Sequence, residues 1–377
     1  MRRYPAYDPP EYVAWQPDPA LLSDFDRSLH ADPARAPLIA ALGEPFLLEL
    51  YSGLLRARLH DVTLKRWVMT GVISKAWLAT GEEAATVGPV RALDPATDYV
   101  APMIRNAAAC REMGEPIAES FRSYLGTGDS TSKGRDGHHG NLAYHALQPI
   151  SHVGDMVPVV AGIALAASMQ GIGDRGRGQS TLSPIPHRPV CLTWIGDGSV
   201  KAAATHEGFN FAAVRKLPAI FIVQDNRVAL GTHIEQAHLP GNYRDLPEAY
   251  GMAGAHFDGN NVLDAWAATR LAADRCRAGE GPVMLIAETF RMGGHATHDE
   301  REARETFPAE WFAAWGSRDP IGLYEEWLAS KGVARGMLEH VEAAVLTEIE
   351  SAERDALASR ETAAPRPESA LENVYAG

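Results

Sequence analysis

The segment from Arg188 to Asn226 most constrains the fold, because it holds two apolar runs separated by a stretch with helical character. The first run, VCLTWI, ends in Gly-Asp-Gly, and the second, AIFIV, ends in Gln-Asp-Asn. Continuously apolar strands that alternate with helices are typical of a parallel sheet buried on both faces. The sequence therefore predicts an α/β fold, in which helices flank both faces of a parallel sheet.

Apolar periodicity predicts further elements on either side of this unit. The run at 156–170 is small and apolar all round, which predicts a buried helix. Helices are predicted at 46–68, 81–93, 114–128, 156–170 and 336–360, and a strand followed by a loop at 281–295.

The flanking composition suggests where the main domain begins and ends. Residues 1–45 are rich in Pro, Asp and Ala, which predicts an extended arm with one short helix. Residues 361–377 form a polar, Pro-rich tail, so 46–360 is expected to be one large domain. We expect 170–188 to be a surface loop. The Gly-, Ser- and His-rich stretch at 126–155 has few apolar positions and is either disordered or functional.

Charge and cysteine content exclude several classes of protein. The 377 residues carry a net charge of −13, which argues against a nucleic-acid or anionic-membrane partner. No apolar run is long enough to span a membrane, and the start MRRYPAYDPP does not read as a signal peptide. The three cysteines are widely spaced and predict neither a disulfide framework nor a zinc site, and the histidines of 126–155 have no zinc-site spacing either. A cytoplasmic location follows.

Asp197 and Asn226 come at the ends of the two predicted strands. Ligands of open parallel sheets bind at the carboxyl ends of the strands, so both side chains can face one point. A carboxylate and an amide oxygen suit Mg²⁺ or Ca²⁺, and the amides of the following helix suit a phosphate. Gly196 and Gly198 allow a tight turn and a close approach. The pattern favours a diphosphate held through a divalent ion over a plain turn.

Gly-Asp-Gly followed by 27 residues and Asn resembles the thiamine diphosphate motif. From about Arg66 to Leu328 the chain is similar to the alpha subunits of the first component of 2-oxo acid dehydrogenase complexes. The segments that carry this resemblance, in the family's order, are ATGEEAATVGPVRALDPATDYV, MIRNAAACREMGEP, KGRDGHHG, ISHVGDMVPVVAGIALA, HEGFNFAAVRKLPAIFIVQDN, ETFRMGGHATHDE and RDPIGLYEEWL. The resemblance implies a thiamine diphosphate-binding fold for 46–360, with thiamine diphosphate and Mg²⁺ as cofactors.

The resemblance also implies roles for individual residues. The magnesium ligands would be Asp197, Asn226 and the backbone carbonyl of Val228. The cofactor-binding residues would be Ile104, Arg105, Ser151, Val153, Gly196, Gly198, Ser199 and Arg291. Guanidinium groups match phosphate geometry, which agrees with the positions of the two arginines in this set.

Two histidines match active-site positions of the family. His295, on a Gly-rich loop, would contact the diphosphate and help order the intermediate or transfer protons, and His138 matches a second histidine of the branched-chain members. A structural role is the alternative for each. Five other histidines lack such support and are expected to be structural, namely His139, His145, His152, His206 and His298.

The family resemblance implies partners. The carboxylate that activates thiamine lies in the family's beta subunit, so this chain is expected to be inactive alone and to act in an α₂β₂ heterotetramer. The acyl unit would pass to a lipoyl group on a separate acyltransferase.

Several positions depart from the family pattern. Ala202-Ala203 replace a polar residue and a glycine, and Ile104 replaces a tyrosine, while Lys201 is a candidate substitute contact to the diphosphate. Ala296 stands where mitochondrial relatives have a phosphorylated serine.

At two positions, Trp77 and Gly293, the chain resembles the branched-chain members of the family, which tend to be apolar at the first and to have glycine at the second. This resemblance implies a branched-chain 2-oxo acid as the substrate. Pyruvate and acetoin are the alternatives. Two further alternatives are a non-oxidative thiamine decarboxylase or ligase, which usually has a longer chain, and a non-catalytic structural relative.

Overall fold

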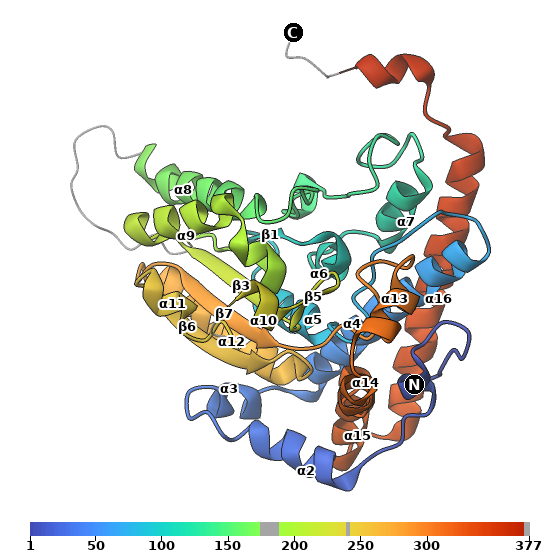
Figure 1. The fold of residues 1–377 in the computed structure, drawn as a ribbon, viewed down its shortest axis with the longest axis horizontal. Coiled ribbons are helices and arrows are strands. Elements are labelled where there is room, and N and C mark those ends of the chain that lie inside the picture. Colours follow the sequence, from blue (N-terminus) through green and yellow to red (C-terminus); the bar gives the residue numbers. More distant parts are fainter. Residues whose placement is uncertain (174–187, 239–241, 373–377) are drawn as a thin grey trace.

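The computed structural model describes residues 1–173, 188–238 and 242–372, and its centre is a parallel β-sheet (Figure 1). The strand order is β1-β2-β3-β7-β6, and every neighbouring pair is parallel. The strands are β1 Tyr99–Ala101, β2 Cys191–Gly196, β3 Ala219–Asp225, β7 Val283–Glu288 and β6 Ala253–Asp258. A separate antiparallel pair joins β4 Val228–Ala229 to β5 Thr232–His233.

Helices cover both faces of the sheet, and the central strand shows how. Along β3, Ile220 and Ile222 pack in the cluster that includes α5 and α12, whereas Phe221 and Val223 pack in the cluster of α8 and α9. Successive side chains of a strand point to opposite faces, so an unbroken apolar strand is buried twice. The covering helices are α5 Ala84–Arg91, α6 Ala108–Glu112, α12 Val262–Arg277, α8 Met156–Gly173 and α9 Ala203–Arg215. The predicted α/β fold is confirmed.

A second helical layer lies beyond the α5 and α12 face. The long helices α4 and α16 pack together there, and Figure 1 shows α16 running along one side of the molecule. The remaining helices of this part are α2 Pro19–Ser28, α3 Ala36–Ala40, α4 Glu44–Met69, α7 Ile117–Leu125, α15 Pro320–Ser330 and α16 Arg335–Thr362. Short elements complete the described chain: α1 Pro10–Val13, η1 Ile104–Asn106, η2 Leu142–Tyr144, η3 Asp197–Lys201, α10 Ile234–Ala237, α11 Leu246–Ala249, α13 Glu300–Thr306, α14 Ala309–Gly316 and η4 Pro367–Leu371. No helix in the described ranges is long and apolar enough to cross a membrane.

Several predictions about individual segments need correction. Residues 1–45 form three short helices rather than one, because a proline stands in the first turn of each and helps to start it. Helix α8 is present but not fully buried, since Val159 and Met169 are exposed. Most of the loop predicted at 170–188, and residues 373–377 of the predicted tail, lie outside the described residues. The domain boundaries at 45 and 360 stay a prediction.

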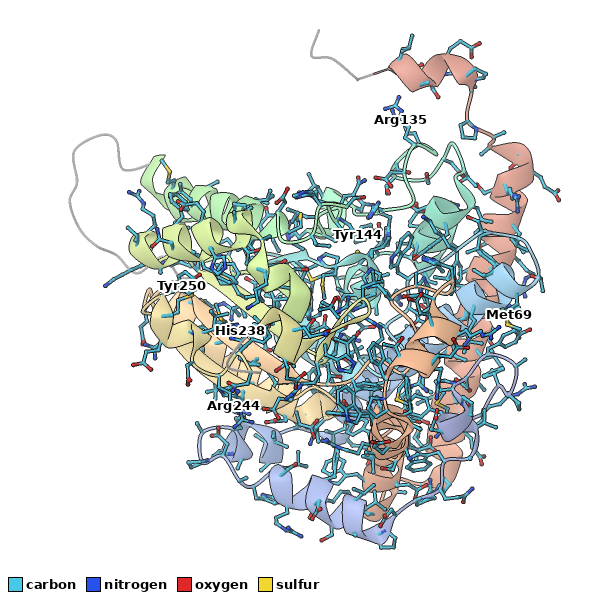
Figure 2. All side chains as sticks on the ribbon, viewed as in Figure 1. Met69, Arg135, Tyr144, His238, Arg244 and Tyr250 are labelled. Atoms are coloured by element: carbon cyan, nitrogen blue, oxygen red, sulfur yellow. The ribbon has the colours of Figure 1, made fainter. Side chains whose placement is uncertain are left out.

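The Gly-, Ser- and His-rich stretch at 126–155 is a structured loop that contacts the end of the chain. The amide of Gly128 donates to the Ala363 carbonyl at 2.6 Å, and Arg135 donates to the Ser369 carbonyl. Figure 2 shows Arg135 reaching from this loop toward η4. The predicted tail therefore packs, in part, against this loop.

A buried ion cluster ties the N-terminal helices to the rest of the molecule. Arg58 of α4 pairs with Glu83 at 2.5 Å and with Asp319 at 3.1 Å, and all three side chains are inaccessible to solvent. The same guanidinium lies 4.5 Å from the ring centre of Tyr12 in α1. Removing one partner of such a buried pair typically costs about 3–5 kcal/mol, because an unpaired charge remains inside.

Candidate active site

The sheet brings the two predicted metal-binding side chains to the same edge. Strands β2 and β3 are neighbours and parallel, and Gly196 pairs in register with Gln224. Asp197 and Asn226 directly follow these two strands, and both are buried. The predicted arrangement of these two residues at the carboxyl ends of successive strands is therefore confirmed.

Asp197 has an oxygen that the described residues leave free. Its Oδ1 accepts a hydrogen bond from the Gly198 amide at 2.7 Å, whereas its buried Oδ2 has no donor in the described part of the chain. Burial raises the pKa of the Asp197 carboxyl to about 6, which measures the cost of keeping the charge without a partner. Buried polar atoms are normally satisfied, so this oxygen calls for a ligand such as a cation.

Gly198 allows close contact between the Asp197 turn and the β4 turn. A Cβ at Gly198 would lie 2.4 Å from the Cβ of Ala229, too close for any side chain. In the neighbouring turn, the amide of Val228 donates to Asn226 Oδ1 at 3.2 Å. The three predicted metal ligands thus lie on two turns that touch through Gly198.

The helix predicted after Gly-Asp-Gly is present as α9, but a short turn comes before it. A 3₁₀ turn, η3, occupies Asp197–Lys201, and α9 begins only at Ala203. Ala202 adopts an extended backbone and offers no side-chain cap, which separates the two elements. The backbone amides nearest to Asp197 therefore belong to η3 rather than to α9.

Glu82 is a central residue of the site that the sequence analysis missed. One of its oxygens accepts from Arg105 Nε at 2.9 Å, and the other accepts from Asn226 Nδ2 at 3.0 Å. Glu82 is fully buried at the start of α5, after Gly81, whose φ of +100° and contact with the Phe290 carbonyl exclude a side chain. The sequence does indicate such a residue, because two consecutive glutamates precede an apolar helix. A carboxylate that is buried there needs a partner.

The two predicted diphosphate-binding arginines form a buried positive site. Arg105, in η1, has Glu82 as its carboxylate partner, whereas within the described residues Arg291 donates only to the carbonyls of Gly293 at 3.4 Å and Leu230 at 3.5 Å. Burial and then the charge of Arg105 lower the pKa of Arg291 to about 10. Arg291 thus has no directly paired carboxylate among the described residues, and a buried guanidinium without such a partner favours an anion.

His295 lies within the field of these arginines. Burial, followed by the charges of Arg291 and Arg105, lowers the pKa of the His295 imidazole to about 4. Its backbone amide donates to Asp299 Oδ2 at 3.1 Å, which fixes the turn that carries the ring. The imidazole is therefore neutral near pH 7, and an anion placed beside the arginines would raise its pKa.

A cavity of about 390 Å³ opens beside these groups. It is lined in part by seven of the residues predicted to form the site: Ile104, Arg105, His138, Ser151, Val153, Ser199 and His295. Trp77, Met103 and Trp194 add apolar surface to the same cavity. A mostly apolar pocket with a few convergent polar groups is the usual form of a cofactor or substrate site.

His138 lines this cavity. Its Nδ1 is 2.7 Å from Asp136 Oδ1, and its Nε2 is 3.3 Å from Ser151 Oγ. The Trp77 ring centre lies 6.4 Å from that of His138. His138 and Ser151 are thus brought together, on a rim where Val153 is exposed.

The side chain of Lys201, one of the departures from the family pattern, contacts two neighbouring side chains. Lys201 Nζ lies 2.5 Å from His238 Nδ1 and 5.2 Å from the ring centre of Tyr243, so its ammonium is engaged there. Tyr243 in turn donates to the Asp197 carbonyl at 2.7 Å. Lys201 thus contributes to the support of the Asp197 turn.

The sequence of the chain also matches a known protein family. Residues 54–365 match the family described as "Dehydrogenase E1 component". The chain belongs to this family. It is 30% identical over 337 residues to the 2-oxoisovalerate dehydrogenase subunit alpha of Bacillus subtilis (strain 168), which covers 87% of this chain and 95% of that protein.

Two pyruvate dehydrogenase subunits are similar to this E1-family chain to about the same degree. The chloroplastic E1 component subunit alpha-3 of Oryza sativa subsp. japonica is 29% identical over 361 residues, or 94% of this chain and 81% of that protein. The human mitochondrial somatic-form E1 subunit alpha is 30% identical over 285 residues, or 75% of this chain and 68% of that protein. Identity alone therefore does not separate the two substrate classes.

The family implies thiamine diphosphate as the cofactor, and the residues present fit it. The free Asp197 oxygen suits a divalent ion, the under-compensated guanidinium of Arg291 suits a diphosphate, and the adjoining cavity has room for the rings.

Proposed function

We propose that this E1-family chain is the alpha subunit of a 2-oxo acid dehydrogenase that uses thiamine diphosphate and Mg²⁺ and acts on a branched-chain 2-oxo acid. The observation that carries the proposal is the unpartnered buried oxygen of Asp197 beside two buried arginines. Together the carboxylate oxygen and the two guanidinium groups would bind a divalent cation and a diphosphate at one edge of the sheet.

The chain's own residues would bind and orient the cofactor. Asp197, Asn226 and the Val228 carbonyl would hold the magnesium ion, and Arg105 and Arg291 would bind the diphosphate. Gly196, Gly198 and Ser199 would bring backbone close to it, and Ile104, Ser151 and Val153 would contact its rings. The chemistry that bound thiamine diphosphate supplies is that of an electron sink for decarboxylation.

The two histidines would act on the substrate side of the cavity. A diphosphate would offset the charges of Arg291 and Arg105, and so raise the pKa of His295 from its low value toward the range useful for proton transfer. His138, held by Asp136 and Ser151, would orient the substrate in the cavity.

The lining of the cavity supports an aliphatic substrate. Trp77, Met103 and Ile150 present apolar surface near His138 and His295. An aliphatic side chain buried there gains about 0.8 kcal/mol for each methylene group, so a branched chain would bind better than the methyl group of pyruvate. Pyruvate and acetoin remain the alternatives.

An exposed apolar surface supports a protein partner. Helix α8 contains no charged residue, yet Val159 and Met169 are exposed, and the adjacent α9 exposes Phe211 and Val214. Large apolar patches on a protein surface mark interaction sites. We propose that a beta subunit covers this surface in an α₂β₂ heterotetramer, which delivers acyl groups to a lipoyl acyltransferase.

We also propose a cytoplasmic location. The three buried cysteines are free thiols, which agrees with the reducing conditions of the cytoplasm.

The proposal is tested by co-expressing the chain with a beta subunit encoded in the same genome. The purified assembly is assayed with a dye acceptor and, in parallel, 3-methyl-2-oxobutanoate, pyruvate and acetoin. We expect turnover that requires thiamine diphosphate, Mg²⁺ and both chains, with the highest kcat/KM for the branched-chain acid. Turnover by the isolated chain would refute the shared site, and preference for pyruvate or acetoin would replace the substrate assignment. Cofactor binding without turnover of any 2-oxo acid would support a non-catalytic relative.

A further inference from the structure

A second cluster of reactive side chains lies outside the cofactor cavity. Cys110 is in α6, Glu115 is in the turn between α6 and α7, and His139 is in the 126–155 loop. All three are buried, and one ligand atom from each lies within 4.8 Å of the other two. His139 Nε2 is 2.6 Å from Glu115 Oε2.

The donor atoms of this cluster differ from those of the Asp197 site. A thiolate sulfur, an imidazole nitrogen and a carboxylate oxygen are the three ligand types that zinc combines in proteins. Magnesium and calcium prefer oxygen alone, and a single thiolate disfavours them. The ligand set therefore selects a borderline transition ion.

One carboxylate oxygen of the cluster lacks a hydrogen-bond donor among the described residues, and a small cavity adjoins the cluster. Glu115 Oε1 is buried and has no hydrogen-bond donor in the described part of the chain. A cavity of about 20 Å³ is bounded by Cys110, Glu115 and His139 among others, which is room for about one water molecule. Ligands of one tetrahedral zinc ion lie about 3.3–3.6 Å apart, given bonds of about 2.0–2.3 Å, so the ligand atoms need shift by only about 1 Å.

The local field favours a positive charge at this point. The Glu115 carboxylate contacts the His139 imidazole inside the molecule, and the Cys110 thiol lies beside both. The nearby cations are already paired, because Glu348 binds Arg56 at 2.8 Å and Arg111 at 2.8 Å. Among the described residues Glu115 has an ion pair only with His139, so its carboxylate can offer an oxygen to a divalent ion.

We propose that Cys110, Glu115 and His139 bind one zinc ion, with a water molecule in the adjoining cavity as the fourth ligand. The ion joins the α6–α7 turn to the loop that carries His138, the neighbour of one ligand. The site acts as a clamp that holds this loop in place, and it is separate from the magnesium site at Asp197.

The test uses the full chain, stripped of metal with a chelator and then supplied with excess Mg²⁺ to occupy the hard-oxygen site. Zinc alone is then titrated and the bound metal is measured after desalting by mass spectrometry. We expect one zinc per chain. Cobalt(II) in place of zinc should give the absorption band of thiolate-to-cobalt charge transfer, which reports the sulfur ligand without any substitution.

Variants identify the ligands. Cys110→Ser and His139→Gln should each weaken zinc binding by at least about 100-fold, since each removes a direct ligand. The matched control is Cys276→Ser, at another buried free cysteine, which should bind zinc as the wild-type chain does. Asp197→Ala should also keep its zinc, because the two sites are separate.

Hydrogen exchange provides the readout for the clamp. Zinc should slow amide exchange in residues 126–155 of the wild-type chain and of Cys276→Ser, but not of Cys110→Ser. Absence of the cobalt–thiolate band in the wild-type chain would overturn the proposal, whether or not the variants fold. Equal zinc content in the wild-type chain and His139→Gln would overturn it as well.

Discussion

The carboxylate of Glu82 accepts a hydrogen bond from Arg105 Nε at 2.9 Å, inside the molecule and away from solvent. Its other oxygen accepts from Asn226 Nδ2 at 3.0 Å. The first bond directs the guanidinium, and the second fixes which way the amide of Asn226 faces. One side chain thus orients a proposed diphosphate ligand and a proposed metal ligand.

Glu82→Gln should therefore weaken thiamine diphosphate binding without removing any group that touches it. We expect a loss of about 10–100-fold, the usual effect of losing the residue that orients a metal ligand. Calorimetric titration with Mg²⁺ and thiamine diphosphate measures it, with the exposed Glu302→Gln as the control. Equal affinity in the two variants would mean that Arg105 and Asn226 are positioned by other contacts.

Gly198→Ala should destabilise the chain, because the new methyl group would lie 2.4 Å from the Cβ of Ala229. The turns must separate, at a cost of about 1–3 kcal/mol in the free energy of unfolding. Urea unfolding of the isolated chain measures this. Gly162→Ala, with open space around its Cβ in the middle of α8, should instead stabilise the chain by about 0.5–1 kcal/mol. The same sign in both variants would contradict the packing argument.

The His295 imidazole should remain neutral well below its ordinary pKa of 6.5 and take up a proton only near pH 4 in the cofactor-free chain. Between these values the unfolded chain binds a proton that the folded chain does not. Stability from this group is thus present above pH 6.5 and is lost as the pH falls toward 4. Histidine NMR titration measures the pKa, and Arg291→Met should raise it. An unchanged His295 pKa in that variant would mean that the charge of Arg291 does not act on this imidazole.

His295→Ala in the assembly with a beta subunit should keep most of its cofactor affinity and lose acylation of the lipoyl domain. We expect a loss of about 100-fold or more, the scale of general acid–base groups. Single-turnover acylation measures it. A side chain that only packs the loop would give a loss of a few-fold, and His295→Gln would restore the rate.

Val159→Asp should weaken association with the beta subunit, because an unpaired charge would be buried in the proposed interface. We expect at least about 10-fold weaker binding, measured by sedimentation of the mixed subunits. Met337→Asp is the control, since Met337 is similarly exposed but lies on α16. If both variants weaken the association equally, or if neither does, the interface does not lie on α8.

Much of the sheet could be predicted because burial on both faces leaves a continuous apolar run in β2, β3 and β7. The other two strands leave weaker patterns. Strand β1 has only three residues, and β6 is a half-exposed edge strand with Gly254 and His256 in it. Helix α12 was missed although Asn261 accepts from the amides of Leu263 and Asp264, a cap that the sequence does signal.

The candidate site was predictable where one short segment carries its chemistry. The turns at Asp197 and Asn226 follow from strand order, because parallel neighbours end at one edge. Glu82 and the Cys110, Glu115 and His139 cluster depend instead on contacts between distant segments. Sequence spacing holds no record of such contacts, so only the folded structure brings them together.

Glu82 and Glu83 are consecutive and both buried, yet their carboxylates bind different partners. Glu82 faces the candidate site, whereas Glu83 belongs to the buried cluster of Arg58 and Asp319, which also reaches Tyr12. Because Glu83 also accepts a hydrogen bond from the Gly81 amide, a substitution in this cluster is expected to disturb the turn that positions Glu82. If thiamine diphosphate binds at the candidate site, saturating amounts of it would stabilise such variants, because a ligand that binds only the folded chain favours folding.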